Sequence, residues 1–339
     1  MDEKHFCEIN NRRYLGNKYR LLPFISRTIA EHCSDINVFA DLFAGTGAVS
    51  SAFSDKTLIT NDILYSNYLC NYAWFGAQKA DLQKVDNLLQ NYNKWDVSQD
   101  NYMSENFGGT FFSHTDCAKI GAIRDDIETL FAQNKLNERE KSILITSLLY
   151  AMDRIAKTCG HYDAFRRGAL FDIQLELRMP NVANNNNPQN KCYNQDINEL
   201  ASKIKADIVY LDPPYNSRQY CDAYHLLENV ARWNKPKVFG VARKMNRGEL
   251  KSAYCTRKAP DAFMRLIESI NARYILLSYN NMAKKGNDRS NARISDESII
   301  NILSAKGELQ IFEESYKPFT TGKSDIANHT ERLFLCKCF

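Results

Sequence analysis

The stretch "ADLFAGTGAVSSAF", residues 40–53, combines the end of an apolar strand, a turn with two glycines and the start of a helix. It continues "NVFADLF" (37–43), which predicts a short buried strand. A second strand is predicted at "KTLITND" (56–62), and a helical, aromatic stretch follows at 63–76. Strands that alternate with helices indicate a parallel sheet covered by helices. We therefore expect an α/β fold with a doubly wound sheet.

The alternation stops between about residues 77 and 190, where helical spacing dominates. Asn137 and Glu140 have the spacing of a capping box at the start of one of these helices. The exception is "FDIQLELRM" (171–179), whose apolar residues alternate with polar ones and predict a half-buried strand. The polar run "ANNNNPQNK" (183–191) predicts a surface loop.

Strand patterns resume after this helical region. They are "KCYNQD" (191–196), "DIVYLD" (207–212), "RYILLSYN" (273–280), "ELQIFEESY" (308–316) and "RLFLCKC" (332–338). The last two have no helical segment between them, so we expect them to pair antiparallel at the sheet edge. The predicted organisation is a sheet domain of residues 1–76 and 191–339, interrupted by a mainly helical domain of residues 77–190.

The composition is that of an ordinary globular protein. The 339 residues carry a net charge of only +4, and the charged amino-terminal segment is unlike a secretory signal. No apolar run is long enough for a membrane span, so we expect a cytoplasmic protein with reduced cysteines. Cys336 and Cys338 form the only close cysteine pair, and we assign them to core packing rather than to a metal site, because no further ligand stands nearby. No metal is therefore expected.

The glycine turn favours a cofactor with a positive charge. Gly45 and Gly47 let the backbone approach a ligand, but a dinucleotide fingerprint would need a third glycine where Ser50 stands. Asp41 at the strand end would repel a pyrophosphate and attract an ammonium group. Asp62, at the end of the next strand, is placed to accept hydrogen bonds from ribose hydroxyls.

"DIVYLDPPY" (207–215) ends a strand with an acid, two prolines and a tyrosine. The carboxyl ends of parallel strands are where ligands bind in open α/β sheets. Ionised Asp212 and the Pro213 carbonyl offer acceptors that suit an exocyclic amino group, and the Tyr215 ring can stack on a flat heterocycle. These residues predict a pocket for an amino-bearing base.

"YLGNK" (14–18), "DLFAGTG" (41–47) and "DPPY" (212–215), in this order, resemble the D12-class, or Dam-like, N6-adenine DNA methyltransferases of the α group. The longer string that begins at "DPPY" is most similar to the methyltransferases of type IIS restriction systems of the FokI kind. The resemblance covers residues 12–75 and 191–339 well. It implies a Rossmann-like catalytic domain that binds S-adenosylmethionine, with residues 77–190 as the target-recognition domain.

The resemblance also implies the activity and its setting. The protein would transfer a methyl group from S-adenosylmethionine to N6 of a flipped adenine in double-stranded DNA. It would be the modification enzyme of a restriction-modification system, a monomer of the bacterial cytosol with a cognate restriction endonuclease as its functional partner. The resemblance also suggests a short asymmetric recognition site such as GGATG, although the insert matches the family only loosely.

The family's cofactor residues map onto one set of positions: Tyr14, Lys18, Asp41, Phe43, Gly45, Gly47, Asp62 and Asp196. Within this set, Lys18 would contact the carboxylate of S-adenosylmethionine, Asp41 its ammonium group and Asp62 its ribose. Asp196 would accept a hydrogen bond from the cofactor's adenine.

The resemblance assigns the target base to Asp212, Pro213 and Tyr215 as catalytic residues. Tyr316 or Phe319 would stack on the other face of the base. Accepting hydrogen bonds at N6 would favour the geometry of the transition state, and flipping the base would cost roughly a few kcal/mol.

A basic segment follows the pocket. Residues 216–258 hold ten lysines and arginines but only three acidic residues, a net charge of +7, which suits phosphate binding. The candidate DNA contacts in it are Arg218, Arg243, Lys244 and Arg247. "AKKGNDRSNAR" (283–293) would add phosphate contacts.

In the helical region, "KTCGHYDAFRRG" (157–168) supplies three further DNA-binding candidates, His161, Arg166 and Arg167. The arginines can read guanine edges, although contact with phosphate alone stays open.

Other classes stay in view. An N4-cytosine methyltransferase would use the same pocket, more often with Ser at position 212, and enzymes acting on RNA or on a protein glutamine more often have Asn there. A non-catalytic DNA-binding module is disfavoured, because it would need neither the acids predicted to bind the cofactor nor the acceptors of "DPPY". A nicotinamide oxidoreductase is disfavoured by Ser50 and Asp41.

Overall fold

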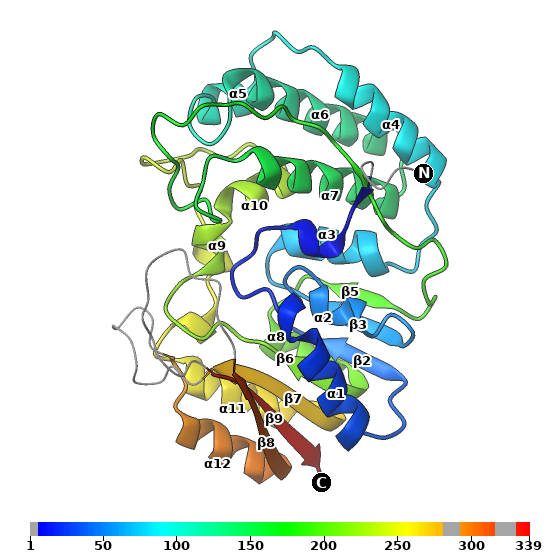
Figure 1. Ribbon diagram of the computed structural model, residues 1–339, viewed down its shortest axis with the longest axis vertical. Helices are drawn as coiled ribbons and strands as arrows, with labels where there is room; N and C mark the ends of the chain where they lie inside the picture. Colours follow the sequence, from blue (N-terminus) through cyan, green and yellow to red (C-terminus); the bar gives the residue numbers. More distant parts are fainter. Residues whose placement is uncertain (1–5, 281–291, 316–329) are drawn as a thin grey trace. The chain divides into compact units, whose positions relative to one another are not determined.

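The computed structural model (Figure 1) describes residues 6–280, 292–315 and 330–339. The chain groups into two compact units. Unit 1 consists of Met1–Asn17, Leu64–Cys192 and Cys221–Gly248. Unit 2 consists of Lys18–Ile63, Tyr193–Tyr220 and Glu249–Phe339. Residues 77–190 thus belong to unit 1, together with segments that the sequence suggested were part of the sheet domain. Their role in target recognition stays a prediction.

The seven-stranded sheet has the order β5-β3-β2-β6-β7-β9-β8. Its strands are β2 (Val38–Asp41), β3 (Thr57–Asn61), β5 (Lys191–Tyr193), β6 (Lys205–Leu211), β7 (Asn271–Asn280), β8 (Gly307–Ser315) and β9 (Thr330–Cys338). β2 pairs parallel with β3 and β6, and β6 pairs parallel with β7, whereas β9 runs antiparallel between β7 and β8. The predicted α/β class with an antiparallel terminal hairpin is therefore confirmed.

Helices cover the sheet of unit 2. They are α1 (Leu22–His32), α2 (Ala48–Ser51), α8 (Ile197–Leu200), α11 (Ala259–Ser269) and α12 (Asp296–Lys306). Leu200, Phe263 and Leu303 bring α8, α11 and α12 into one apolar cluster with alternate residues of the strands, such as Val209 and Leu277. Because strand side chains alternate between faces, this packing fixes the register that brings the strand ends to one edge.

Unit 1 is mainly helical. It contains α3 (Tyr65–Phe75), α4 (Leu82–Lys94), α5 (Tyr102–Phe107), α6 (His114–Ala132), α7 (Glu138–Ile155) and α10 (His225–Arg232), with α9 (Tyr220–Ala223) at a boundary between the units. The short strands β1 (Phe6–Cys7) and β4 (Met179–Pro180) pair parallel. α7 is buried along almost its whole length. In the described ranges, no helix combines the length and the apolarity needed to cross a bilayer.

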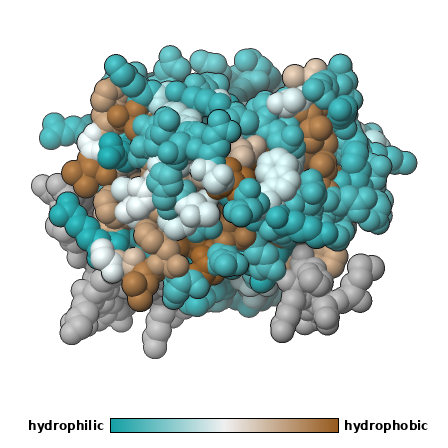
Figure 2. All heavy atoms as spheres, turned by 90° about the horizontal axis from the view of Figure 1, so that it is seen from above, coloured by the Kyte–Doolittle hydropathy of each residue, from teal (hydrophilic) through white to brown (hydrophobic). Residues whose placement is uncertain are grey.

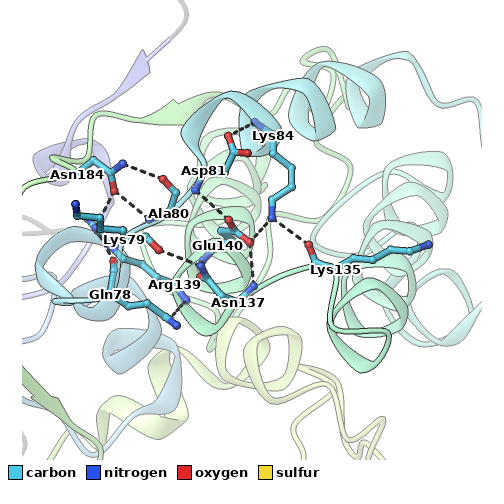
Figure 3. A network of polar contacts seen from close by, with 10 residues as sticks. All are labelled: Gln78, Lys79, Ala80, Asp81, Lys84, Lys135, Asn137, Arg139, Glu140 and Asn184. Atoms are coloured by element: carbon cyan, nitrogen blue, oxygen red, sulfur yellow. Dashed lines mark hydrogen bonds and ion pairs between the residues drawn. The ribbon is translucent and has the colours of Figure 1, made fainter.

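The predicted capping box at α7 is confirmed (Figure 3). The Asn137 side chain accepts from the Glu140 amide, and the Glu140 side chain accepts from the Asn137 amide, both at 2.9 Å. Lys84 of α4 also pairs with Glu140 at 2.6 Å. This network anchors the start of α7 to the start of α4, since Glu140 also accepts from the Asp81 amide at 2.9 Å.

Side chains from distant segments satisfy both ends of α3. Buried Glu228 accepts from the amides of Tyr65 and Ser66 at 3.0 and 2.9 Å. At the other end, Asn186 donates to the carbonyls of Trp74 and Gly76 at 2.9 and 3.0 Å. The predicted loop 183–191 is confirmed up to Asn190, since Lys191 begins β5. Its asparagines bind helix carbonyls that would otherwise lack partners.

The predicted strand at 171–179 is wrong, because only Met179 and Pro180 pair as a strand. Leu175 and Leu177 are buried, but their amides donate to Asp116 and Asn93 at 3.2 and 2.7 Å. Helix side chains therefore satisfy this backbone in place of a neighbouring strand.

Candidate active site

Asp212 follows β6 and lies in a cluster of charged residues. Lys18 Nζ is 3.0 Å from its Oδ1, and the Tyr215 hydroxyl donates to the same oxygen at 2.8 Å. Within the described residues, no donor reaches Asp212 Oδ2 or the Pro213 carbonyl. One carboxylate oxygen is thus fixed by the protein, while the other acceptors remain open to a ligand.

Glu331, on β9, is a second acid in this cluster that the sequence interpretation missed. It is buried, accepts from the Ser278 hydroxyl at 2.9 Å and lies 3.4 Å from Lys18 Nζ. The Tyr215 hydroxyl is 2.6 Å from Glu331 and 2.8 Å from Asp212, so the two carboxylates share its single hydrogen. No spacing along the chain signals this contact, because it depends on the pairing of β7 with β9. An acid just before the apolar run 333–336 was the available hint.

Burial and charge oppose each other in this cluster. Burial raises the pKa of Asp212, Lys18 lowers it and Glu331 raises it. Burial lowers the pKa of Lys18, but the nearby charges of Asp212 and Glu331 outweigh burial and raise it above its ordinary value. Lys18 therefore stays protonated between two carboxylates. Its predicted contact with a cofactor carboxylate stays a prediction.

Asp41, at the end of β2, is a buried acid with an incompletely satisfied carboxylate. It is 1% exposed, and the Ser50 hydroxyl donates to its Oδ2 at 2.9 Å. Oδ1 has no hydrogen-bond partner in the part of the chain that the structure describes. Burial raises the pKa of Asp41 to about 7, the Ser50 bond lowers it, and Asp212 and Asp62 raise it. A ligand ammonium would satisfy the open oxygen, so this residue fits the charge of S-adenosylmethionine.

The glycine turn holds Asp62 in place. Gly45 and Gly47 have φ values of 53° and 81°, in the left-handed region that favours glycine. The Gly45 amide donates to Asp62 Oδ2 at 2.9 Å, and the Asn194 amide group donates to the Asp62 carbonyl at 2.7 Å. The carboxylate at the end of β3 is thus oriented by the turn that follows β2.

Phe43 and Asp196 belong to one connected group in unit 2. The Phe43 ring meets Tyr254 edge-on, with 5.1 Å between ring centroids, and the Tyr254 hydroxyl donates to Asn198 at 3.0 Å. Asp196 caps α8 by accepting from the Asn198 amide at 2.8 Å. Tyr254 and Asn198 were not identified from the sequence, since neither stands in a motif.

Tyr14 lies in unit 1, where it stacks on Tyr224 with 4.5 Å between ring centroids. Its hydroxyl accepts from Asn67 at 2.9 Å. Its predicted cofactor contact stays a prediction.

The predicted DNA-binding residues have different surroundings. Lys244 pairs with Asp163 and Arg247 with Asp222, both at 2.6 Å. Arg166, Arg167, Arg218 and Arg243 are exposed, and in the described ranges no carboxylate pairs with them. His161 lies 3.8 Å from Asp163. Tyr316, Phe319 and residues 283–291 lie outside the described residues.

Relatives of the chain carry consistent names. It is 36% identical to modification methylase StsI of Streptococcus sanguinis over 91% of this chain and 48% of that protein. It is 31% identical to type II methyltransferase M.FokI of Planomicrobium okeanokoites over 95% of this chain and 51% of that protein. Type II methyltransferase M.NlaIII of Neisseria lactamica is 30% identical over 93% of this chain and 95% of that protein. The chain thus spans about half the length of the first two relatives.

A mostly parallel sheet with an antiparallel terminal hairpin, and with acids at the ends of β2 and β6, is consistent with the fold of S-adenosylmethionine-dependent methyltransferases. The chain belongs to the D12 class of N6 adenine-specific DNA methyltransferases, whose family model matches residues 14–288. The family resemblance inferred from the motifs is confirmed.

Proposed function

We propose that the chain is a site-specific DNA methyltransferase that transfers a methyl group from S-adenosylmethionine to N6 of a flipped adenine. The observation that carries this proposal is the pair of acids on neighbouring strands. Asp41 ends β2 with an open, buried oxygen, and Asp212 follows β6 with an open Oδ2. The first acid suits a cationic cofactor, and the second suits an amino group.

On the cofactor side, Asp41 holds the ammonium group and Asp62 accepts from the ribose. Phe43 and Asp196 flank the cofactor's adenine. Gly45 and Gly47 let the backbone approach the cofactor closely. Bound S-adenosylmethionine supplies an activated methyl group on its sulfonium. Asp41 would therefore contribute by binding and orienting the cofactor, not by taking part in bond formation.

On the base side, Asp212 Oδ2 and the Pro213 carbonyl accept from the two N6 hydrogens. The N6 lone pair is delocalised into the ring, so acceptors that favour a pyramidal nitrogen stabilise the transition state more than the ground state. Lys18 and Tyr215 hold the other Asp212 oxygen, at 3.0 and 2.8 Å, which fixes the direction of Oδ2. Glu331 in turn positions Lys18 and Tyr215.

The substrate is double-stranded DNA. Arg218, in unit 2, and Arg166, Arg167 and Arg243, in unit 1, are exposed cations suited to phosphate or base contacts. We place Tyr316 or Phe319 on the second face of the flipped base. The names of the relatives support a role as the modification enzyme of a restriction-modification system. We further propose that a cognate endonuclease is its functional partner and that it acts as a cytoplasmic monomer.

The test is incubation of the protein with unmethylated plasmid and methyl-labelled S-adenosylmethionine, followed by long-read mapping of modified bases. We expect label in DNA and N6-methyladenine at one short sequence. Label at N4 of cytosine would overturn the assignment of the base. If the protein bound the cofactor in an Asp41-dependent way but left no label in DNA, the assignment of the substrate would be wrong.

A further inference from the structure

The exposed apolar side chains of unit 1 are concentrated in two short segments. Among the described residues of this unit, every exposed large apolar side chain is one of Leu170, Phe171, Ile173, Phe239 and Val241. In Figure 2, the apolar side chains of the viewed face form separate brown areas in a mainly hydrophilic surface. Clustered exposed apolar residues often mark a binding surface.

Residues 239–244 form a tight hairpin, which we call hairpin 239–244. Phe239 and Lys244 exchange backbone hydrogen bonds of 2.8 and 2.9 Å, and Gly240 and Arg243 have φ values of 70° and 51°. Phe239 is 62% exposed, and Val241, within the turn, is 68% exposed. The paired backbone therefore presents two apolar side chains to solvent on a short, well-defined turn.

An ion pair connects hairpin 239–244 to the loop that bears Arg166 and Arg167. Lys244 Nζ is 2.6 Å from Asp163, which belongs to that loop, and Figure 1 shows the yellow hairpin and the green loop on the same side of unit 1. Arg247, just after the hairpin, pairs with Asp222 at 2.6 Å. The predicted phosphate ligands Lys244 and Arg247 thus hold the base of the hairpin.

The charge of the surface favours a polyanion. Asp163 and Asp222 are engaged by Lys244 and Arg247, whereas Arg166, Arg167 and Arg243 have no carboxylate partner in the ranges that the structure describes. Apolar side chains flanked by unpaired arginines match duplex DNA, which has phosphates outside and stacked bases inside. Proteins that bend DNA use apolar side chains in this way, inserted between base pairs.

We propose that hairpin 239–244 is a wedge that inserts Phe239 between base pairs of duplex DNA, with Val241 beside it and the three arginines on the flanking phosphates. This proposal rests on the proposed function, since it deepens how the substrate is gripped. Partial unstacking of a base step lowers the remaining cost of extruding a base, which is otherwise roughly a few kcal/mol.

The experiment measures DNA unwinding. Closed circular plasmid is saturated with protein in the presence of S-adenosylhomocysteine, relaxed with topoisomerase I and deproteinised, and its topoisomers are resolved on a gel. Insertion between base pairs unwinds the duplex, so we expect the wild-type protein to change the linking number. Phe239→Ala should reduce this change per bound protein at least twofold, and Phe239→Trp should retain it.

Phe339→Ala is the matched control, because Phe339 is also exposed and lies in unit 2, outside the hairpin. It should behave like the wild type. Arg243→Gln should lower the salt slope of binding by about one. Val241→Ala gives a second, milder test of the same hairpin, and circular dichroism checks that each variant is folded.

Unchanged unwinding in Phe239→Ala would overturn the wedge, as would a wild-type protein that binds DNA without unwinding it. Equal losses in Phe239→Ala and Phe339→Ala would also overturn it. The methylation assay is read separately: methylation without Phe239-dependent unwinding rejects the wedge alone. Phe239-dependent unwinding without methylation rejects the proposed function alone.

Discussion

The Asp212 cluster and the base of hairpin 239–244 both contain an ion pair between a lysine and a carboxylate, but the two pairs differ in their exposure to solvent. Lys18 and Glu331 expose 7% and 4% of their side chains, whereas Lys244 and Asp163 expose 25% and 29%. Breaking a buried charge pair typically costs about 3–5 kcal/mol, because it leaves one charge without a partner. A surface pair contributes only about 0–1 kcal/mol. The comparison predicts that substitutions in the Asp212 cluster have large effects, whereas substitutions at the base of the hairpin have small ones.

The largest effect is expected for Asp212→Ala. The variant removes the acceptor aimed at N6 but leaves Lys18 paired with Glu331, so the fold should persist. Loss of one such preorganised hydrogen-bonding group costs about 10²- to 10³-fold in kcat. Transfer of labelled methyl groups measures the loss, and calorimetry with S-adenosylhomocysteine should show nearly unchanged binding.

Asp55→Ala is the control for this variant, because Asp55 is an exposed aspartate of unit 2 that pairs with neighbouring Lys56. Its turnover should match the wild type. If Asp212→Ala retained comparable turnover, the catalytic assignment would be wrong.

Glu331→Gln should have an intermediate effect, about tenfold in kcat, as expected when a charge-assisted hydrogen bond worth about 1.5–3 kcal/mol is weakened. The carboxylate of Glu331 raises the pKa of Asp212, so its removal should lower that pKa. The acid limb of the pH–rate profile should therefore move to lower pH. Glu314, on β8, supplies the control variant Glu314→Gln, because its side chain is 42% exposed and pairs with Arg27 near the surface. A profile that does not move would mean that Glu331 acts on structure alone.

Asp41 should make cofactor binding depend on pH. Its folded pKa is raised by burial to about 7 from 3.8, so the protonated form stabilises the ligand-free protein. This stabilisation is present below about pH 4 and is lost as pH rises through 7. A ligand ammonium binds the ionised form, so S-adenosylhomocysteine should raise Tm more at pH 8 than at pH 6.

Asp41→Asn should remove this difference between the two pH values while leaving the fold intact. Thermal shifts measured with and without ligand provide the comparison. An identical Tm gain at both pH values in the wild type would argue against an ammonium partner for Asp41.

The smallest expected effect is on the salt slope of DNA binding, which should differ between an arginine without a carboxylate partner in the described residues and the paired Lys244. Arg167→Gln removes an exposed cation without a carboxylate partner in the described residues, and it should lower the salt slope of DNA binding by about one. Lys244→Gln should change the slope less, because Asp163 already neutralises that charge. Titrations at several salt concentrations measure both slopes. Equal changes would show that Lys244 leaves Asp163 to bind phosphate.

Local patterns in the sequence predicted the residues proposed to bind the cofactor. Asp41, Gly45 and Asp62 stand at the ends of adjacent strands, and the order of motifs along the chain is enough to bring them together. Glu331 was missed because its contact with Tyr215 crosses 116 residues and depends on strand register. Lys18 was assigned to the cofactor, but its charge is shared with Asp212 and Glu331.

Misjudged segments have a common cause. At 171–179, alternation of apolar residues predicted a strand, but Asn93 and Asp116 bind the backbone amides of Leu177 and Leu175. Lys244 and Arg247 were predicted to bind phosphate, but in the structure Lys244 pairs with Asp163 and Arg247 pairs with Asp222. In each case, a side chain from another segment supplied a partner that composition cannot reveal.

The position of β9 in the sheet has a consequence for the newly made protein. A ribosome produces the chain at roughly 5–20 residues per second, so β8 emerges while the strand that must lie between it and β7 is still missing. The edge of β7 is then open for a time, and Lys18 lacks its second counter-charge. The Asp212 cluster can form only after Glu331 has been translated. A nascent chain that already carries "DPPY" would therefore hold Lys18 with only one of its two carboxylate partners until β9 has been made.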